Sequence, residues 1–154
     1  MSHPNAALIT TFYAAFQRRD AAAMNACYAE DVRFRDPVFE LEGWRAGAMW
    51  RMLCERGKDL RVEFSAVNAD DTTGSAHWEA WYTFSATKRP VHNVIDASFR
   101  FTSGRISAHE DRFDFHRWAR QAFGPAGLLL GWTPMFRAAV RRKSAALLDH
   151  YTRR

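Results

Sequence analysis

The stretch YAEDVRFRDPVF, residues 28–39, carries the clearest structural signal in the chain. Apolar and polar residues alternate through its middle, so Val32, Phe34 and Asp36 lie on one face of a predicted strand. Pro37 has no N–H group to donate to a neighbouring strand, which predicts an edge strand or a strand that turns into a loop here. The pattern therefore places a carboxylate, Asp36, at a strand end and on the same face as two apolar side chains.

Three helices are predicted around this strand. The first covers residues 4–18, where apolar residues recur at helical spacing and a proline fits the first turn. Asp20 is a residue type that caps helices and precedes an alanine-rich segment, which predicts a short second helix. The third helix begins after Gly43 and ends near Gly57.

From residue 60 the hydrophobic period changes to two, the period of a strand. Turn-like segments separate four predicted strands, which cover residues 60–67, 75–86, 91–101 and 105–115. A run of helices followed by a meander of strands predicts an α+β fold, in which the helices pack on one face of a curved antiparallel sheet.

Helical periodicity returns in the C-terminal part of the chain. Gly124 and Pro125 break it, and Pro134 opens a final helix. The apolar stripe expected on this helix is Phe136, Val140, Leu147 and Tyr151. We therefore divide the chain into a domain of residues 1–115 and a helical extension of residues 116–154, which we expect to pack on the same domain.

The composition is that of one folded domain. The chain has 154 residues, of which 47% are hydrophobic, and this excludes an intrinsically disordered protein. We find no apolar run long enough to span a bilayer, and the N-terminus lacks the pattern of a secretory signal. Cys27 and Cys54 lack the spacing of metal ligands and lie among apolar residues, which indicates reduced thiols in packed positions. We expect a cytoplasmic protein.

The net charge of +5 is concentrated in the final helix. Residues 134–154 hold six Lys or Arg side chains and one Asp, so the remainder of the chain is neutral. A basic helix of this kind is solvated, contacts anionic lipid or contacts nucleic acid. Because the excess charge belongs to one helix and not to the whole domain, we expect a solvated helix and no nucleic-acid partner. Contact with lipid stays open as the alternative.

Three segments carry a family resemblance: LITTFYAAFQRRD (8–20), YAEDVRFRDPVF (28–39) and VIDASFRFTSGRISAHEDRFDF (94–115). With the order of helices and strands, they resemble the SnoaL-like polyketide cyclases and ketosteroid isomerases of the nuclear transport factor two-like superfamily. The resemblance implies a cone-shaped curved sheet packed against three N-terminal helices, with a mostly apolar pocket inside. It also implies a cofactor-free isomerase or cyclase, an apolar small-molecule ligand and a homodimer.

The resemblance also assigns roles to residues. In ketosteroid isomerases the Asp of the Asp-Pro pair is the base that moves a proton between carbons, and Asp36 matches it. In SnoaL-like cyclases an acidic residue on the last strand is the acid and base, and Asp111 looks like it. His109 lies two residues earlier and therefore faces the same way.

The donors that hold the enolate oxygen in ketosteroid isomerases match this chain less well. Their tyrosine aligns with Phe12, and their protonated aspartate aligns with Asp96 or with Ala97, depending on which neighbouring residues guide the alignment. A base without such donors leaves the enolate charge unstabilised. We expect the substrate pocket to include Phe12, Phe16, Trp50, Trp81 and Asp96.

Each candidate also has a structural interpretation. An Asp before Pro often caps a turn, and His109 and Asp111 can form a buried hydrogen bond. A metal site of His92, His109 and Asp111 is an alternative, but nothing fixes the strand register that would bring them together, and we expect no metal. We find no G-x-S-x-G motif, phosphate-binding loop or dinucleotide fingerprint. Two hypotheses remain: proton transfer next to a carbonyl by Asp36 or Asp111, and a non-catalytic small-molecule-binding or dimeric interaction module.

The segment FGPAGLLLGW, residues 123–132, is too apolar to lie free in water. We expect it to pack across or beside the mouth of the pocket, or to extend the dimer interface. The arginines of the final helix are expected to face solvent.

Overall fold

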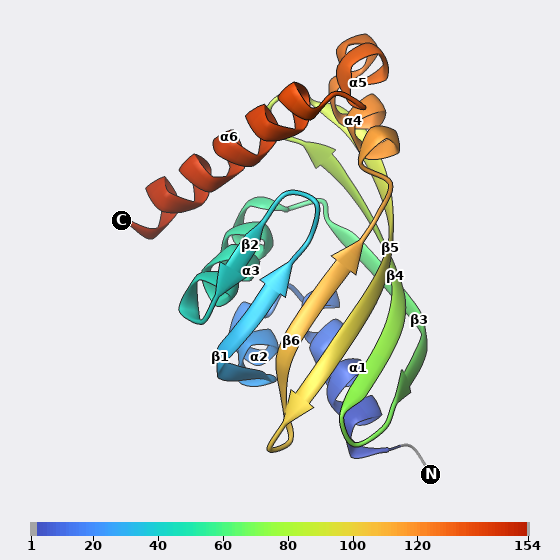
Figure 1. The fold of residues 1–154 in the computed structure, drawn as a ribbon, viewed down its shortest axis with the longest axis vertical. Coiled ribbons are helices and arrows are strands. Elements are labelled where there is room, and N and C mark those ends of the chain that lie inside the picture. Colours follow the sequence, from blue (N-terminus) through green and yellow to red (C-terminus); the bar gives the residue numbers. More distant parts are fainter. Residues whose placement is uncertain (1–2, 154) are drawn as a thin grey trace.

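Six strands form one curved sheet in the order β2-β1-β6-β5-β4-β3 in the computed structural model, which describes residues 3–153 (Figure 1). β1 and β6 are parallel, and all other neighbouring strands are antiparallel. The strands are β1 (Tyr28–Arg35), β2 (Glu40–Glu42), β3 (Arg61–Ala69), β4 (Thr73–Phe84), β5 (Arg89–Thr102) and β6 (Arg105–Arg112).

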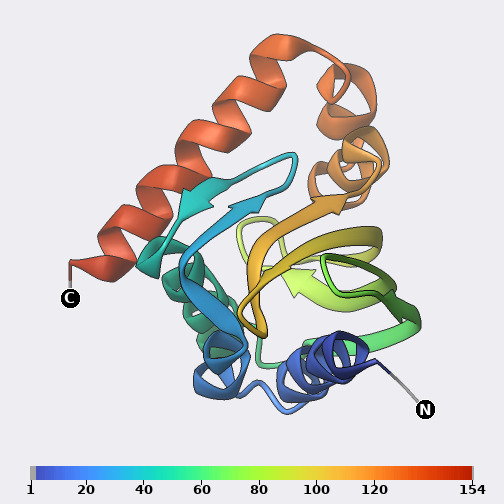
Figure 2. The ribbon, with the colours of Figure 1, turned by 60° about the horizontal axis from the view of Figure 1, so that its bottom comes forward.

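Along the chain, helices lie before, between and after the strands. The helices are α1 (Pro4–Gln17), α2 (Ala21–Ala26), α3 (Trp44–Arg56), α4 (Phe115–Phe123), α5 (Pro125–Leu130) and α6 (Pro134–Thr152). Figure 2 shows how the sheet curls, with α6 running beside the β1–β2 hairpin. The predicted α+β order of three helices and a meander is confirmed. Within residues 3–153, none of the helices has the length and apolar character needed to cross a bilayer.

β1 ends where the sequence pattern predicted. Val32 and Phe34 are buried on the inner face of the sheet. Asp36 follows the strand directly, and its Oδ1 accepts hydrogen bonds from the backbone N–H groups of Val38 (2.7 Å) and Phe39 (2.6 Å). The carboxylate therefore holds the turn that leads from β1 into β2.

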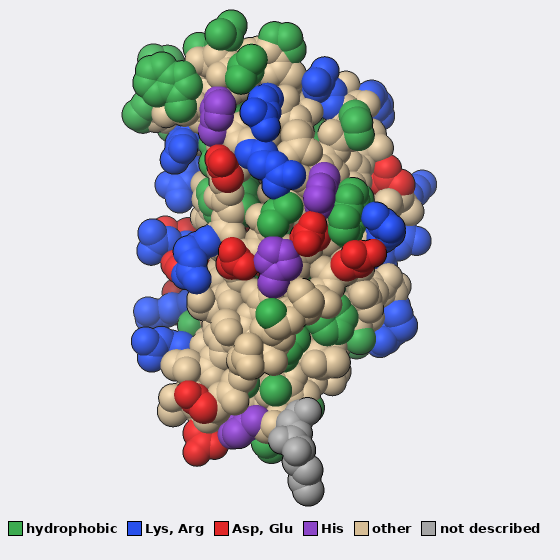
Figure 3. All heavy atoms as spheres, turned by 90° about the vertical axis from the view of Figure 1, so that its right-hand side faces the viewer, with side chains coloured by type: hydrophobic (Ala, Val, Ile, Leu, Met, Phe, Trp, Pro, Cys, Tyr) green, Lys and Arg blue, Asp and Glu red, His purple; other side chains and the backbone are tan. Residues whose placement is uncertain are grey.

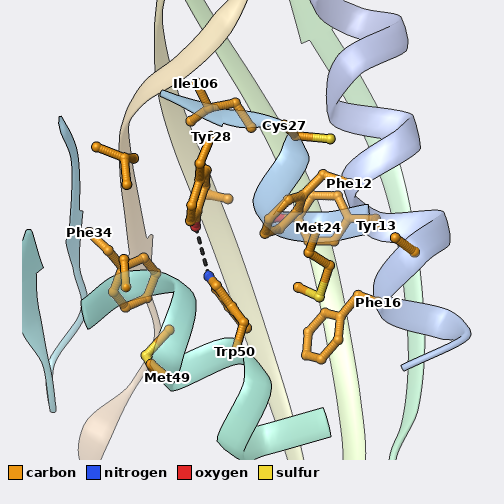
Figure 4. Packing of buried hydrophobic residues seen from close by; sticks show 14 of the residues in the cluster. Phe12, Tyr13, Phe16, Met24, Cys27, Tyr28, Phe34, Met49, Trp50 and Ile106 are labelled. Carbon is orange, nitrogen blue, oxygen red and sulfur yellow. Dashed lines mark hydrogen bonds between the residues drawn. The ribbon is translucent and has the colours of Figure 1, made fainter. Parts of the chain in front are cut away.

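The main core fills the space between α1, α3 and the inner face of the sheet (Figure 4). Gly74 lets α1 approach the sheet closely, because a Cβ there would lie 2.9 Å from Ile9 Cδ1. The largest side chains in this core are aromatic, and both cysteines are buried in it as free thiols. The aromatic residues are Phe12, Tyr13, Phe16, Tyr28, Phe34, Trp50, Trp78, Phe99 and Phe101.

The apolar stripe predicted on α6 is corrected at one position. Leu148 is fully buried, whereas Leu147 is 44% exposed. The reason is that α6 packs on two different surfaces along its length. Val140 belongs to a second apolar cluster with α4, and Leu148 and Tyr151 belong to the main core. One straight stripe therefore does not describe the buried face.

We predict that Leu148→Ala lowers the free energy of unfolding by about 2–5 kcal/mol, because it leaves a cavity in the main core. The matched variant Leu147→Ala should change it by less than about 0.5 kcal/mol, because this side chain is half exposed. Urea unfolding of the three proteins measures both values. Equal effects of the two substitutions would contradict the packing of α6 described above.

Candidate functional site

Asp36 keeps one carboxylate oxygen free. Its Oδ1 accepts the two backbone hydrogen bonds of the turn, while Oδ2 accepts none from any residue that the structure describes. The residue is partly exposed. The pKa of the carboxyl group is raised from 3.8 to about 7, because burial and, less strongly, the charge of Asp111 outweigh the hydrogen bonds from Phe39 and Val38, which lower it. A carboxyl group with this pKa exchanges protons readily at neutral pH.

The charge of Asp36 acts on Tyr82, a phenol on β4. Its oxygen accepts a hydrogen bond from Trp118 Nε1 of α4 at 2.8 Å. The pKa of Tyr82 is raised to about 12, mainly by burial and also by the charge of Asp36, against the Trp118 hydrogen bond, which lowers it. Among residues 3–153, no group accepts a hydrogen bond from the Tyr82 hydroxyl. Tyr82 can therefore donate a hydrogen bond to a ligand near Asp36.

Sequence reasoning missed Tyr82 and Trp118 as site residues. The signal for Tyr82 was present, because the alternation along β4 places it on the same face as Trp78. Nothing in the sequence pattern indicated that α4 would bring Trp118 to the same place, because the two residues lie 36 positions apart.

A chain of buried hydrogen bonds connects α3 to β6. Trp50 Nε1 donates to the Tyr28 oxygen at 2.8 Å, drawn as a dashed line in Figure 4. The Tyr28 hydroxyl lies 2.8 Å from His109 Nδ1, and His109 Nε2 lies 2.9 Å from Asp111 Oδ1. Trp78 Nε1 donates to the same Asp111 oxygen at 3.2 Å.

Chemistry fixes the donors at the two ends of this chain. An indole N–H only donates, so the Tyr28 oxygen accepts from Trp50 and the carboxylate of Asp111 accepts from Trp78. A carboxylate has no proton to donate, so His109 Nε2 donates to Asp111. The Tyr28 oxygen can accept a second hydrogen bond, so the direction of its bond with His109 Nδ1 depends on the imidazole tautomer.

Aromatic side chains close this chain off from water. His109 and Asp111 are 1% and 3% exposed. The His109 ring lies 4.5 Å from the ring of Phe99 and stacks on Trp50 at 6.0 Å. Two of the residues expected in the substrate pocket, Phe12 and Trp50, thus enclose the imidazole, and Phe16 packs behind Trp50.

Tyr13 has a hydroxyl without a partner. The side chain is fully buried, and its oxygen makes no hydrogen bond within the described part of the chain. Burial raises the pKa of Tyr13, and the charge of Asp111 adds to this effect. α1 therefore does carry a phenol near Asp111, one residue after the position at which the family alignment expected it.

Asp96 and Trp81 lie on the outer face of the sheet, which corrects their assignment to the pocket. Asp96 Oδ1 is 2.9 Å from His77 Nδ1, and Trp81 stacks on His92 at 4.5 Å. Figure 3 shows histidine and acidic side chains gathered on this face. The physical reason is the alternation of β5 and β4, in which Ala97 and Trp78 point inward and their neighbours outward.

The outward direction of His92 also separates it from His109 and Asp111, so these three do not form a metal site. Within residues 3–153, we find no group of three or more His, Cys, Asp or Glu side chains arranged to hold a metal ion. A groove of about 700 Å³ lies over the outer face, and its charged lining residues are Arg33, Arg35, Glu40, Glu42, Arg100 and Glu110.

We predict that the side-chain carboxyl of Asp36 titrates with a midpoint near pH 7 in a carbon-detected NMR experiment. Because the pKa is higher in the folded state, the folded state keeps the proton between about pH 4 and 7 while the unfolded chain loses it. The wild type therefore loses stability as the pH rises through this window. Asp36→Asn keeps the turn but cannot titrate, so its stability relative to the wild type should rise from pH 4 to 7. A midpoint near pH 4 would contradict this prediction.

Comparison with known proteins places these features in a family. The SnoaL-like domain model matches residues 9–109. A nuclear transport factor two-like protein of unknown function from Burkholderia pseudomallei has 20% identity and a TM-score of 0.66, over 78% of this chain and 98% of that chain. TerC, co-crystallised with polyporic acid, has 17% identity and a TM-score of 0.67, over 79% of this chain and 100% of that chain.

A third solved structure is a protein from Catenulispora acidiphila with a ketosteroid isomerase-like fold, in complex with trimethylamine. It has 15% identity and a TM-score of 0.67, over 82% of this chain and 97% of that chain. No curated protein matches the chain. The family model covers well over half of the residues, and the resemblance and fold expected from the sequence are confirmed. The chain belongs to the SnoaL-like domain family, with the nuclear transport factor two-like fold.

Proposed function

We propose that this protein binds an apolar ring compound beside Asp36 and moves a proton next to the carbonyl group of that compound. The observation that carries the proposal is Asp36, a partly exposed residue whose carboxyl group has an oxygen without a protein hydrogen bond and a pKa of about 7, which suits a group that both takes and returns a proton at neutral pH. Its free Oδ2 is available to the substrate.

Asp36 fits the role of the base better than Asp111 does. Asp111 is buried, and its Oδ1 is already shared by His109 and Trp78. Its fixed negative charge instead raises the pKa of Asp36. Asp111 and His109 are therefore positioning residues in this proposal, which set the electrostatic field in which Asp36 works.

The proposed step is an enolisation. Asp36 Oδ2 takes a proton from the carbon next to the carbonyl, the C–H electron pair forms a C=C bond, and the carbonyl oxygen gains the negative charge. The Tyr82 hydroxyl, oriented by Trp118, donates a hydrogen bond to that oxygen. An isomerase then returns the proton to another carbon, whereas in a cyclase the enolate carbon attacks a second carbonyl of the same molecule.

The surroundings of Asp36 support an apolar ligand. The turn after Asp36 packs through Val38 into the second apolar cluster, which joins the end of the sheet to α4 and α6. The partly buried members of this cluster are Val38, Tyr82, Phe84, Phe113, Phe123 and Phe136. Two similar structures contain small organic molecules, polyporic acid and trimethylamine, which supports small-molecule binding on this fold.

The test uses 2-tetralone, a ring ketone with exchangeable protons next to its carbonyl. In deuterated buffer we expect the wild type to accelerate exchange of these protons, as followed by proton NMR. Asp36→Asn should lose about 100-fold or more of this acceleration, the usual contribution of a general base. Asp96→Asn is the matched control, because this carboxylate lies on the outer face, and it should exchange at the wild-type rate.

Equal exchange rates for the wild type and Asp36→Asn would remove Asp36 from the mechanism. Binding of 2-tetralone without exchange in the wild type would favour the second candidate, a non-catalytic binding module. The enclosure of His109 and Asp111 by aromatic side chains is the observation that supports this alternative.

We also propose a homodimer through the outer face of the sheet. Trp81 and the groove on this face provide apolar and charged surface for a second copy. Light scattering at micromolar concentration should then give about twice the chain mass of 17.7 kDa. A mass equal to that of one chain would contradict the proposal.

A further inference from the structure

Five large apolar side chains are exposed together at α5 and the start of α6, and we call them the apolar tip. Their exposed fractions are 49% for Leu128, 68% for Leu129, 50% for Leu130, 66% for Trp132 and 82% for Met135. Figure 3 shows hydrophobic side chains gathered at the end of the molecule where α5 lies in Figure 1. The second half of FGPAGLLLGW was expected to pack beside the mouth or to extend a dimer interface; within one chain it is exposed and does not pack beside the mouth.

The packing of α5 on α4 fixes the position of the apolar tip. Gly127 is buried, and a Cβ at this position would overlap the carbonyl oxygen of Ala119 in α4. A Cβ at Gly131 would lie 2.9 Å from the Cβ of Ala119. His116 Nε2 also bonds the carbonyl oxygen of Leu128 at 3.0 Å. α5 thus packs on α4 through its glycines, and this packing leaves its leucines facing outward.

The segment around the apolar tip carries charge of one sign. Residues 115–148 contain six Lys or Arg side chains and no Asp or Glu. Arg137, Arg141, Arg142 and Lys143 are exposed along α6. Leucines, a tryptophan and a methionine thus project from a surface that is otherwise positive.

We propose that the apolar tip and the basic residues of α6 dock on the surface of an anionic membrane. In this arrangement the leucines enter the boundary of the acyl chains, and Trp132 lies at the level of the headgroups. The Lys and Arg side chains attract the anionic lipids. An anionic lipid surface complements both features, because its acyl chains accept the exposed apolar side chains and its headgroups attract the positive charge around them.

A second copy of the chain fits the same surface less well. Contact from tip to tip would bring two positive segments together, and like charges oppose such an interface. A nucleic acid would match the charge but would leave the three leucines in water.

Docking at the apolar tip also has a consequence for the proposed site. α4 supports α5 through Ala119 and, one residue earlier, holds Tyr82 through Trp118. If the proposed function holds, an apolar substrate dissolved in the bilayer would reach Asp36 from a nearby surface. The docking itself does not depend on the proposed function.

The experiment measures sedimentation of the full chain with phosphatidylcholine vesicles, with and without about one third phosphatidylserine. We expect the wild type to bind the anionic vesicles at low salt and to bind less at high salt. The double variant Leu129→Ser/Trp132→Ser should lower the partition coefficient roughly tenfold or more. Arg142→Gln should lower it roughly fivefold.

Trp44→Ser is the matched control, because Trp44 is 68% exposed but lies on α3, away from α5 (Figure 1). It should bind vesicles like the wild type, and circular dichroism should show that all variants are folded. Absence of wild-type binding, or equal binding of the double variant and the wild type, would overturn the proposal. A wild-type dimer that the double variant converts to monomer, with no vesicle binding by either, would assign the apolar tip to a second copy instead.

Discussion

The buried carboxylate of Asp111 is the constraint on which the interior of this protein depends. An ionised carboxylate in an apolar core costs several kcal/mol unless donors satisfy it. Here the donors are one imidazole and one indole, and a second indole at the far end of the chain of hydrogen bonds donates to the Tyr28 oxygen. The participating residues tie α3 to three strands and are Trp50, Tyr28, Trp78, His109 and Asp111.

The same carboxylate shapes the chemistry at the end of the sheet. Its charge raises the pKa of Asp36, which is already raised by burial, and the charge of Asp36 in turn raises the pKa of Tyr82. The C-terminal helices complete this region, because Trp118 holds Tyr82 and Arg141 Nε donates to the carbonyl oxygen of Pro37 at 3.0 Å. The extension lies beyond the residues that match the family model and still forms part of the candidate site.

The strand patterns show how far sequence reasoning reached. Alternation separated Trp78 from Trp81 and placed Asp36 at the end of β1, and the structure has both features. Yet both faces of β4 carry aromatic residues, so the pattern did not reveal which face meets the helices. Trp81 was therefore assigned to the pocket although it faces outward. Asp96 was misplaced for a related reason, because the family alignment left a shift of one residue open and such a shift moves a side chain to the other face.

By itself the sequence determined the local elements and the family, because caps, breakers and hydrophobic periods act over a few residues. Pro37 ended a strand, Asp20 capped a helix, and the change of period at residue 60 marked the start of the meander. Only the tertiary structure decided which side chains meet at the site. The pKa of Asp36 depends on burial and on the charge of Asp111, a residue 75 positions away in the sequence. Burial and charge act through space, so only the folded chain gives that carboxyl group its properties.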